Sequence, residues 1–144
     1  MSKRAVSPVI ATVLLIALVT AAAAIVFLVV MPMLKPAPDA LITPQQGSTA
    51  ATSNNRKIQV DIKALNGDLN ISSVSAVISS NGTTLSGVTI EDAQGNSLIG
   101  SLINKDQSIT AYIVGPFVQG TQYSITISFT SGGSTISKTF DVTA

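Results

Sequence analysis

Hydrophobic residues follow two different patterns in the two parts of this chain. Residues 5–34 carry no charge and are almost entirely apolar, whereas apolar and polar residues alternate from Arg56 onward, as at Ile58, Val60 and Ile62. An uncharged apolar run of 18 or more residues is long enough to cross a membrane. Alternation with period two is typical of half-buried strands. The pattern therefore predicts an α+β protein, in which a long N-terminal hydrophobic helix precedes a β domain.

The hydrophobic helix is expected over residues 6–34. Ser7 is placed to cap its N-terminus, and Pro8 then falls at the first helical position, where a missing N–H costs nothing. Pro32 disfavours helical geometry in the residue before it, so the regular helix is expected to end near Met31.

The rest of the chain is expected to form a linker and one outer domain. Residues 35–55 are rich in proline and then in small polar residues, which predicts a linker. Residues 56–144 contain about seven short alternating segments, which predicts an antiparallel, immunoglobulin-like β-sandwich. Asn81-Gly82 is a two-residue hairpin signal. The last hairpin is expected to turn at residues 131–134.

Three interpretations of the apolar segment follow from its flanks. Positive charge next to an apolar span stays in the cytoplasm, so Lys3 and Arg4 place the bulk of the chain outside. A secretory signal peptide could be cut near the small residues 21–24, but the apolar run continues through Val30 and exceeds the usual length. A permanent membrane anchor is the second interpretation. The third is a segment that enters the membrane and later forms the core of a filament.

The sequence SKRA followed by VSPVIATVLLIALVTAAAAIV resembles an archaeal type IV prepilin over about the first 35 residues. In that family a short basic leader is removed in front of the hydrophobic helix, and the retained helix packs with its copies in a filament. The resemblance implies a leader of residues 1–5. Its cleavage-site residues would be Lys3, Arg4, Ala5 and Val6, with the cut between Ala5 and Val6.

One departure from bacterial type IV pilins fits the archaeal branch. Bacterial pilins carry Glu at the fifth mature position, whereas this chain has Ile10. The resemblance implies a pilus subunit on the archaeal cell surface that serves in adhesion and has a membrane-inserted precursor. Its partners would be identical subunits, the prepilin peptidase and the assembly machinery. An archaellin is the alternative within the same superfamily. A membrane-anchored extracellular binding module, for example for sugars, is the alternative outside it.

Alanines are frequent along the hydrophobic segment. Small residues let helices approach closely where apolar burial gives no preference between lipid and protein, although alanine is also a good helix former. The predicted helix-packing positions are Ala11, Ala17, Ala21, Ala22 and Ala24.

The composition offers little for catalysis. The chain has no cysteine and no histidine, so disulfides and the commonest nucleophiles, proton shuttles and transition-metal ligands are missing. We therefore expect neither an enzyme nor a cofactor or metal site. Outside the leader, the chain has six basic and seven acidic residues, so no nucleic-acid partner is expected. In a filament, contacts with neighbouring subunits can supply stability that disulfides do not.

Hydroxyl groups are abundant in the outer domain. Residues 43–144 contain 16 serines and 13 threonines. Two N-glycosylation sequons occur in this segment, at Asn70 and Asn81. Asn81 is the stronger candidate because a hairpin tip would expose it to a modifying enzyme, and glycans would keep a weakly charged surface soluble.

Overall fold

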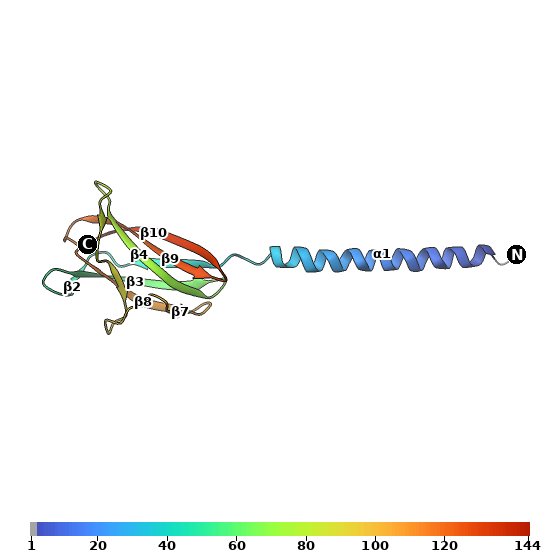
Figure 1. The fold of residues 1–144 in the computed structure, drawn as a ribbon, viewed down its shortest axis with the longest axis horizontal. Coiled ribbons are helices and arrows are strands. Elements are labelled where there is room, and N and C mark those ends of the chain that lie inside the picture. Colours follow the sequence, from blue (N-terminus) through green and yellow to red (C-terminus); the bar gives the residue numbers. More distant parts are fainter. Residues whose placement is uncertain (1–2) are drawn as a thin grey trace. The chain divides into compact units, whose positions relative to one another are not determined.

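The computed structural model describes residues 3–144, with side chains described from Ser7 onward. The chain divides into two compact units, one ending at Pro36 and one running from Ala37 to Ala144. The first unit contains a single helix, α1 (Lys3–Met33), and the second contains ten strands. Figure 1 labels α1 and most of the strands.

Helix α1 is longer than the sequence pattern predicts. It begins at Lys3, so Ser7 is not its N-cap and Pro8 lies inside the helix. Lys3, Arg4 and Ala5 are good helix formers, and they extend the helix in front of the proline. At its other end the helix includes Pro32 and continues to Met33. A proline this close to the end removes one backbone hydrogen bond without stopping the last turn.

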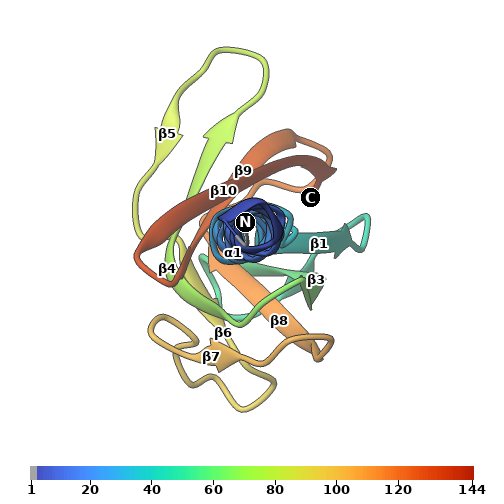
Figure 2. The ribbon, with the colours of Figure 1, turned by 90° about the vertical axis from the view of Figure 1, so that its right-hand side faces the viewer.

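Ten strands form two antiparallel sheets that pack face to face (Figure 2). Sheet A has the order β1-β3-β8-β6, with β2 also paired to β3. Sheet B has the order β10-β9-β4-β5, with β7 also paired to β4. The strands are β1 (Asp39–Pro44), β2 (Thr49–Ala50), β3 (Arg56–Leu65), β4 (Leu69–Ile78), β5 (Thr84–Leu85), β6 (Thr89–Glu91), β7 (Leu102–Ile103), β8 (Ser108–Gly115), β9 (Gln122–Ser131) and β10 (Ser134–Thr143).

This strand order is that of the immunoglobulin fold. In the usual lettering, sheet A corresponds to strands A, B, E and D, and sheet B to strands G, F and C, with β5 in the place of C′. The prediction of a long hydrophobic helix followed by an immunoglobulin-like β-sandwich is therefore confirmed.

The linker is much shorter than expected. Residues 35–55 were expected to be a linker, but β1 begins at Asp39 and pairs with β3 from Asp39↔Leu65 to Pro44↔Val60. Ala40 is buried in the core and Ile42 packs against it, so this segment has the alternation of a strand. Prolines on both sides of the short segment hide that alternation in the sequence. The outer unit therefore includes residues that the sequence pattern leaves outside it.

The core lies between the two sheets. Strand β3 contributes Ile58, Val60 and Ile62, and β9 contributes Tyr123 and the three apolar residues that alternate after it, all fully or almost fully buried. Burying one Ile or Phe side chain contributes roughly 1.5–3 kcal/mol. No polar or charged residue is buried among the residues whose side chains are described. This apolar interior replaces the disulfide that many domains of this shape contain.

The two predicted hairpins form with different turns. The last one closes through Gly132-Gly133, both with positive φ, between the paired residues Ser131 and Ser134; this is the two-residue turn that matches the twist of the strands. The turn after β4 is not the expected two-residue turn at Asn81-Gly82. Its loop has four residues, because the N–H of Ile78 pairs with the carbonyl of Thr83 at 2.9 Å, and Gly82, not Asn81, has positive φ.

A tyrosine fixes the connection into β9. The backbone N–H of Val118 donates to the hydroxyl of Tyr123 at 2.8 Å, and the ring of Phe117 meets the Tyr123 ring edge-to-face at 5.0 Å. A tyrosine at this place, with its hydroxyl bonded to backbone a few residues upstream, is the tyrosine corner of immunoglobulin-like domains. Tyr123 is expected in the core from its periodicity, but its hydrogen bond is not visible in the sequence.

Candidate functional sites on the helix and the sandwich

Helix α1 exposes apolar side chains on every side. All described side chains from Ser7 to Leu34 are exposed, and within Ser7–Met33 a window of 18 residues has a mean hydropathy of 3.1. By length and composition this is the one helix among the described residues that could cross a membrane. The same features occur in signal sequences, so the helix is compatible with membrane insertion or with secretion.

The two threonine hydroxyls inside the helix are satisfied by the helix itself. The hydroxyl of Thr12 donates to the carbonyl of Val9 at 2.8 Å, and that of Thr20 lies 3.0 Å from the carbonyls of Ile16 and Ala17. Because such bonds leave no donor unpaired, both threonines can enter an apolar environment at little cost.

The five predicted packing alanines lie within one half of the helix circumference. With 3.6 residues per turn, Ala17, Ala21 and Ala24 share one face, and Ala11 and Ala22 share an adjacent one. All five are exposed. Larger apolar side chains such as Leu14, Leu18 and Ile25 project from the same half, so the alanines are the gaps between them at which a second helix could approach closely.

The predicted cleavage residues lie at the start of the helix. The backbones of Lys3, Arg4, Ala5 and Val6 belong to α1, and their side chains lie outside the described part of the chain. The cleavage prediction therefore rests on the sequence.

The structure separates the two glycosylation candidates. Asn81 is exposed in the four-residue loop of the β4–β5 hairpin, which extends away from the two sheets at the top of Figure 2, and its side-chain oxygen accepts from the N–H of Thr83 at 3.0 Å. Asn70 lies half-buried within β4, and its amide nitrogen donates to the carbonyl of Gly100 at 3.2 Å. The nitrogen that would carry a glycan is accessible at Asn81 and engaged at Asn70.

The outer face of sheet B is covered by hydroxyl groups that pair across strands. Thr126 and Thr139 lie 2.7 Å apart, oxygen to oxygen, and Ser128 and Ser137 lie 2.9 Å apart. The neighbouring position on β10, Asp141, accepts a hydrogen bond from Ser124. These groups satisfy one another, so this face offers few unpaired donors or acceptors.

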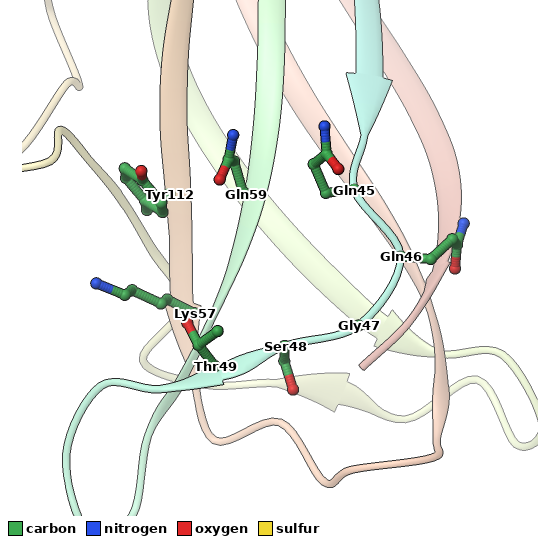
Figure 3. Close-up of a pocket in the computed structure, with 8 residues that line it drawn as sticks. All are labelled: Gln45, Gln46, Gly47, Ser48, Thr49, Lys57, Gln59 and Tyr112. Carbon is green, nitrogen blue, oxygen red and sulfur yellow. The ribbon is translucent and has the colours of Figure 1, made fainter.

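The outer face of sheet A carries a different set of groups. A polar row crosses four adjacent backbone segments: Gln45 lies beside Gln59, Gln59 pairs with Tyr112, and Tyr112 pairs with Glu91. Lys57 lies two residues before Gln59 on β3, and its ammonium nitrogen is 5.1 Å from the centroid of the Tyr112 ring. Figure 3 shows Gln45, Gln59, Tyr112 and Lys57 among the residues that line one depression.

Two depressions adjoin along this row. The first has a volume of 240 Å³ and is lined by Gln45, Gln59 and neighbouring residues of the loop between β1 and β2. The second has a volume of 420 Å³ and extends to Glu91 and the loop that follows it. Lys57 and Tyr112 line both depressions, so their side chains lie at the shared boundary. We call these two depressions together the Tyr112 groove.

The Asp92 carboxylate next to the groove is hydrogen-bonded by groups of its own loop. Asn96 donates to the Asp92 carboxylate through its side-chain amide and its backbone N–H, and the N–H of Gln94 donates as well. These hydrogen bonds, the one from the Asn96 side chain first, hold the pKa of Asp92 below its usual value. Asp92 therefore stabilises the turn after β6. Among the described residues, no cluster of three or more potential metal ligands occurs.

The Tyr112 groove cannot be recognised in the sequence because its members come from four segments that are separated along the chain. Tyr112 and Gln59 each occupy an outward position in an alternating strand, and that position alone predicts a solvated side chain. An outward tyrosine in a chain with only two tyrosines is the one signal that could have pointed to it.

Comparisons with known proteins do not identify a family. Neither a protein-family profile nor a curated protein sequence matches the chain. Solved structures that resemble it include a family 123 glycoside hydrolase from Clostridium perfringens, with a TM-score of 0.45 and 14% identity over 74% of this chain and 27% of that one. This chain therefore spans about a quarter of the hydrolase.

Two further structures resemble the chain. The GAE domain of GGA2p from Saccharomyces cerevisiae has a TM-score of 0.37 and 11% identity, with 76% of this chain and 97% of that one covered. The thioester domain of the Enterococcus faecium TIE86 protein has a TM-score of 0.34 and 19% identity, with 74% and 42% covered. Similarities this distant carry no argument about what the chain does.

Proposed function

We propose that this protein is a structural subunit of an archaeal type IV pilus. Its N-terminal helix polymerises with identical helices into the filament core, and its sandwich lies on the filament surface. Before assembly the helix resides in the membrane, and the prepilin peptidase removes residues 1–5. Surface adhesion is the role that the family resemblance implies.

The observation that supports this proposal is the uncovered apolar helix. Its side chains from Ser7 to Leu34 are exposed around the whole circumference, and an apolar surface of that size does not stay in contact with water. Lipid covers such a helix in the membrane, and copies of the same helix can cover it outside. The alanines and the internally bonded threonines suit both environments.

The leader distinguishes a pilin from a fixed anchor. Prepilin processing removes the basic pair Lys3-Arg4, whereas an anchor keeps it as its topology signal. A filament subunit is released from the cell by shearing, whereas an anchored binding module stays with the membrane. Processing and location can therefore be measured on the same sample.

The test is N-terminal sequencing and intact mass of the protein in filaments sheared from cells. We expect a mature N-terminus at Val6 and a mass that includes a glycan at Asn81. Replacing Ala5 with Phe should leave the leader attached and abolish filaments, because a bulky side chain does not suit the cut; Ala5→Gly is the matched control and should be processed. Filaments whose subunits still begin at Met1, or protein found only in membranes, would contradict the proposal.

A further inference from the structure

We infer that the Tyr112 groove on the outer face of sheet A is a binding site for a neutral oligosaccharide. The proposed ligand lies across the strands, along the row from Gln45 to Glu91. This site is separate from the helix and does not depend on filament formation.

The first argument is the spacing of the row. Gln45, Gln59, Tyr112 and Glu91 occupy neighbouring positions on four adjacent segments of one sheet. Adjacent strands lie about 4.8 Å apart, so the row spans about 14 Å. An extended ligand that crosses the strands would therefore meet a polar group at each step.

The second argument is that three of the four groups of the row have no partners within the protein, whereas Glu91 accepts a hydrogen bond from the hydroxyl of Thr89 at 2.9 Å. In the described part of the chain, the side-chain amides of Gln45 and Gln59 and the hydroxyl of Tyr112 make no hydrogen bond to another protein group. Nearby outward groups on the same sheet differ: Thr110 donates to Asp61 at 2.7 Å. Each free amide offers both a donor and an acceptor, which matches pairs of adjacent sugar hydroxyls.

The third argument is the ring of Tyr112. It is half-buried, and the Lys57 ammonium 5.1 Å from its centroid holds it in place by a cation–π contact. A fixed aromatic ring with a polar tip gives apolar contact area at low entropic cost. The C–H faces of a sugar ring are suited to such a surface.

The fourth argument concerns charge and excludes other ligand classes. Lys57 brings one positive charge to the groove, and Glu91 and Asp92 bring two negative charges, of which the Asp92 carboxylate is engaged by its own turn. A polyanion would meet net repulsion, and among the described residues no cluster of three or more potential ligands is present for a metal cation. A neutral ligand with many hydroxyl groups fits the amide-rich lining without needing a charge partner.

The experiment is titration of the full-length protein, in phosphocholine micelles that carry no sugar head group. The probes are four neutral tetrasaccharides (maltotetraose, cellotetraose, mannotetraose and tetra-N-acetylchitotetraose) and one heparin-derived tetrasaccharide. Binding is followed by saturation-transfer NMR and calorimetry. We expect at least one neutral probe to bind with Kd on the order of 1 mM and the heparin fragment not to bind.

Two variants test the location. Tyr112→Ala and Gln59→Ala should each weaken binding by about tenfold or more, since one loses the ring and the other loses hydrogen bonds. Gln122→Ala is the matched control: Gln122 is an exposed glutamine on β9 beside a separate depression that has no aromatic lining, and its replacement should leave Kd unchanged. If Tyr112→Ala does not fold, Gln59→Ala still tests the location of the site.

Two results would overturn the inference. One is the absence of binding by all four neutral probes at about ten times the expected Kd. The other is binding that persists in both Tyr112→Ala and Gln59→Ala. Because these residues lie on the sandwich, both variants should still be processed and assembled. Loss of sugar binding with normal filaments would therefore leave the pilin proposal intact, and loss of filaments with normal binding would refute only that proposal.

Discussion

At the scale of single residues, the two tyrosines of this chain have opposite environments. Tyr123 is 1% exposed, and its hydroxyl accepts from the N–H of Val118. Tyr112 lies on the outer face of sheet A beside Lys57. Removing the hydroxyl from each tyrosine therefore compares a structural hydrogen bond with a surface group of the same chemistry.

We predict that Tyr123→Phe destabilises the sandwich by about 1–2 kcal/mol, because it leaves a half-buried N–H without a partner. The edge-to-face contact with Phe117 is retained. The measurement is thermal unfolding of the full chain in micelles, followed by β-sheet circular dichroism. Tyr112→Phe is the control and should change stability by less than about 0.5 kcal/mol. Equal effects of the two replacements would show that the Tyr123 hydroxyl does not anchor the corner.

Periodicity predicts the interior of the sandwich well, because each inward residue has the same local signature. The alternation at Ile58–Ile62 and Tyr123–Phe129 identifies two central strands and their buried faces. Local signals fail where a property depends on distant partners. The hydroxyl–backbone bond of Tyr123 and the row between Gln59 and Tyr112 exist only once the strands have paired, so neither could be derived from sequence.

At the scale of elements, the edges of the sheets need explanation. Strands β1 and β10 are the edges of the two sheets on one side of the sandwich, and edge strands invite unwanted pairing. Lys138 lies on the β10 face that otherwise points inward, with Ile136 and Phe140, and its ammonium binds the Asp39 carboxylate of β1 at 2.7 Å. This ion pair joins the two edges, and an inward charge discourages further strand addition.

Strand β1 explains why the linker is shorter than the sequence pattern predicts. Residues 39–44 contain only two inward apolar side chains, Ala40 and Ile42, between prolines. Six residues with that composition resemble a polar linker until β3 is available as a pairing partner. The boundary of the outer unit is therefore a tertiary property, whereas the hydrophobic helix is recognisable from composition alone.

The edge ion pair predicts a pH dependence. The hydrogen bond from Lys138, followed by that from the N–H of Ala40, holds the pKa of Asp39 below its ordinary value of 3.8. Folding thus favours the carboxylate, so the stabilisation is present above about pH 4 and is lost as the pH falls through the lowered pKa. Both side chains are more than one-third exposed, so the effect is at most about 1 kcal/mol.

We expect Lys138→Met to unfold at a lower temperature than the natural protein at pH 7, and the two melting temperatures to converge as the pH falls through the lowered pKa of Asp39. Thermal unfolding between pH 7 and 2 provides the measurement. Lys105→Met, which removes an exposed lysine, is the control and should follow the natural protein throughout. A difference of constant size across this pH range would show that loss of the Lys138 stem, rather than of its charge, causes the destabilisation.

At the scale of the whole molecule, three surfaces have distinct chemistry. Helix α1 is apolar on every side, the outer face of sheet B carries hydroxyls that bond to one another, and the outer face of sheet A carries the charged and aromatic groups. The proposed function assigns the first surface to assembly. Asp141 is the one charged group that we describe on the hydroxyl face, so in the proposed filament copies of this face can be crowded without strong mutual repulsion.

The assembly role of the helix can be tested without disturbing its insertion into lipid. A charge in the middle of the helix costs about 2.5–3.5 kcal/mol on the insertion scale and would damage a membrane span as well as a filament core. A change of size separates the two environments, because lipid adapts to the three carbon atoms that Ala→Leu adds whereas a close helix contact does not. Overpacking such a contact costs about 1–3 kcal/mol, repeated in every subunit.

We therefore predict that Ala22→Leu leaves membrane insertion and leader cleavage intact but weakens or abolishes filaments. The matched control is Ala23→Leu: at about 100° per residue, Ala23 points about 100° or more away from each of the five predicted packing alanines. The measurements are N-terminal sequencing of the membrane fraction, the yield of sheared filaments and their melting temperature. Normal filaments from Ala22→Leu would show that these alanines are not a packing surface. Equal loss in both variants would show that the helix is packed tightly on all sides, so that contact is not confined to the alanine face.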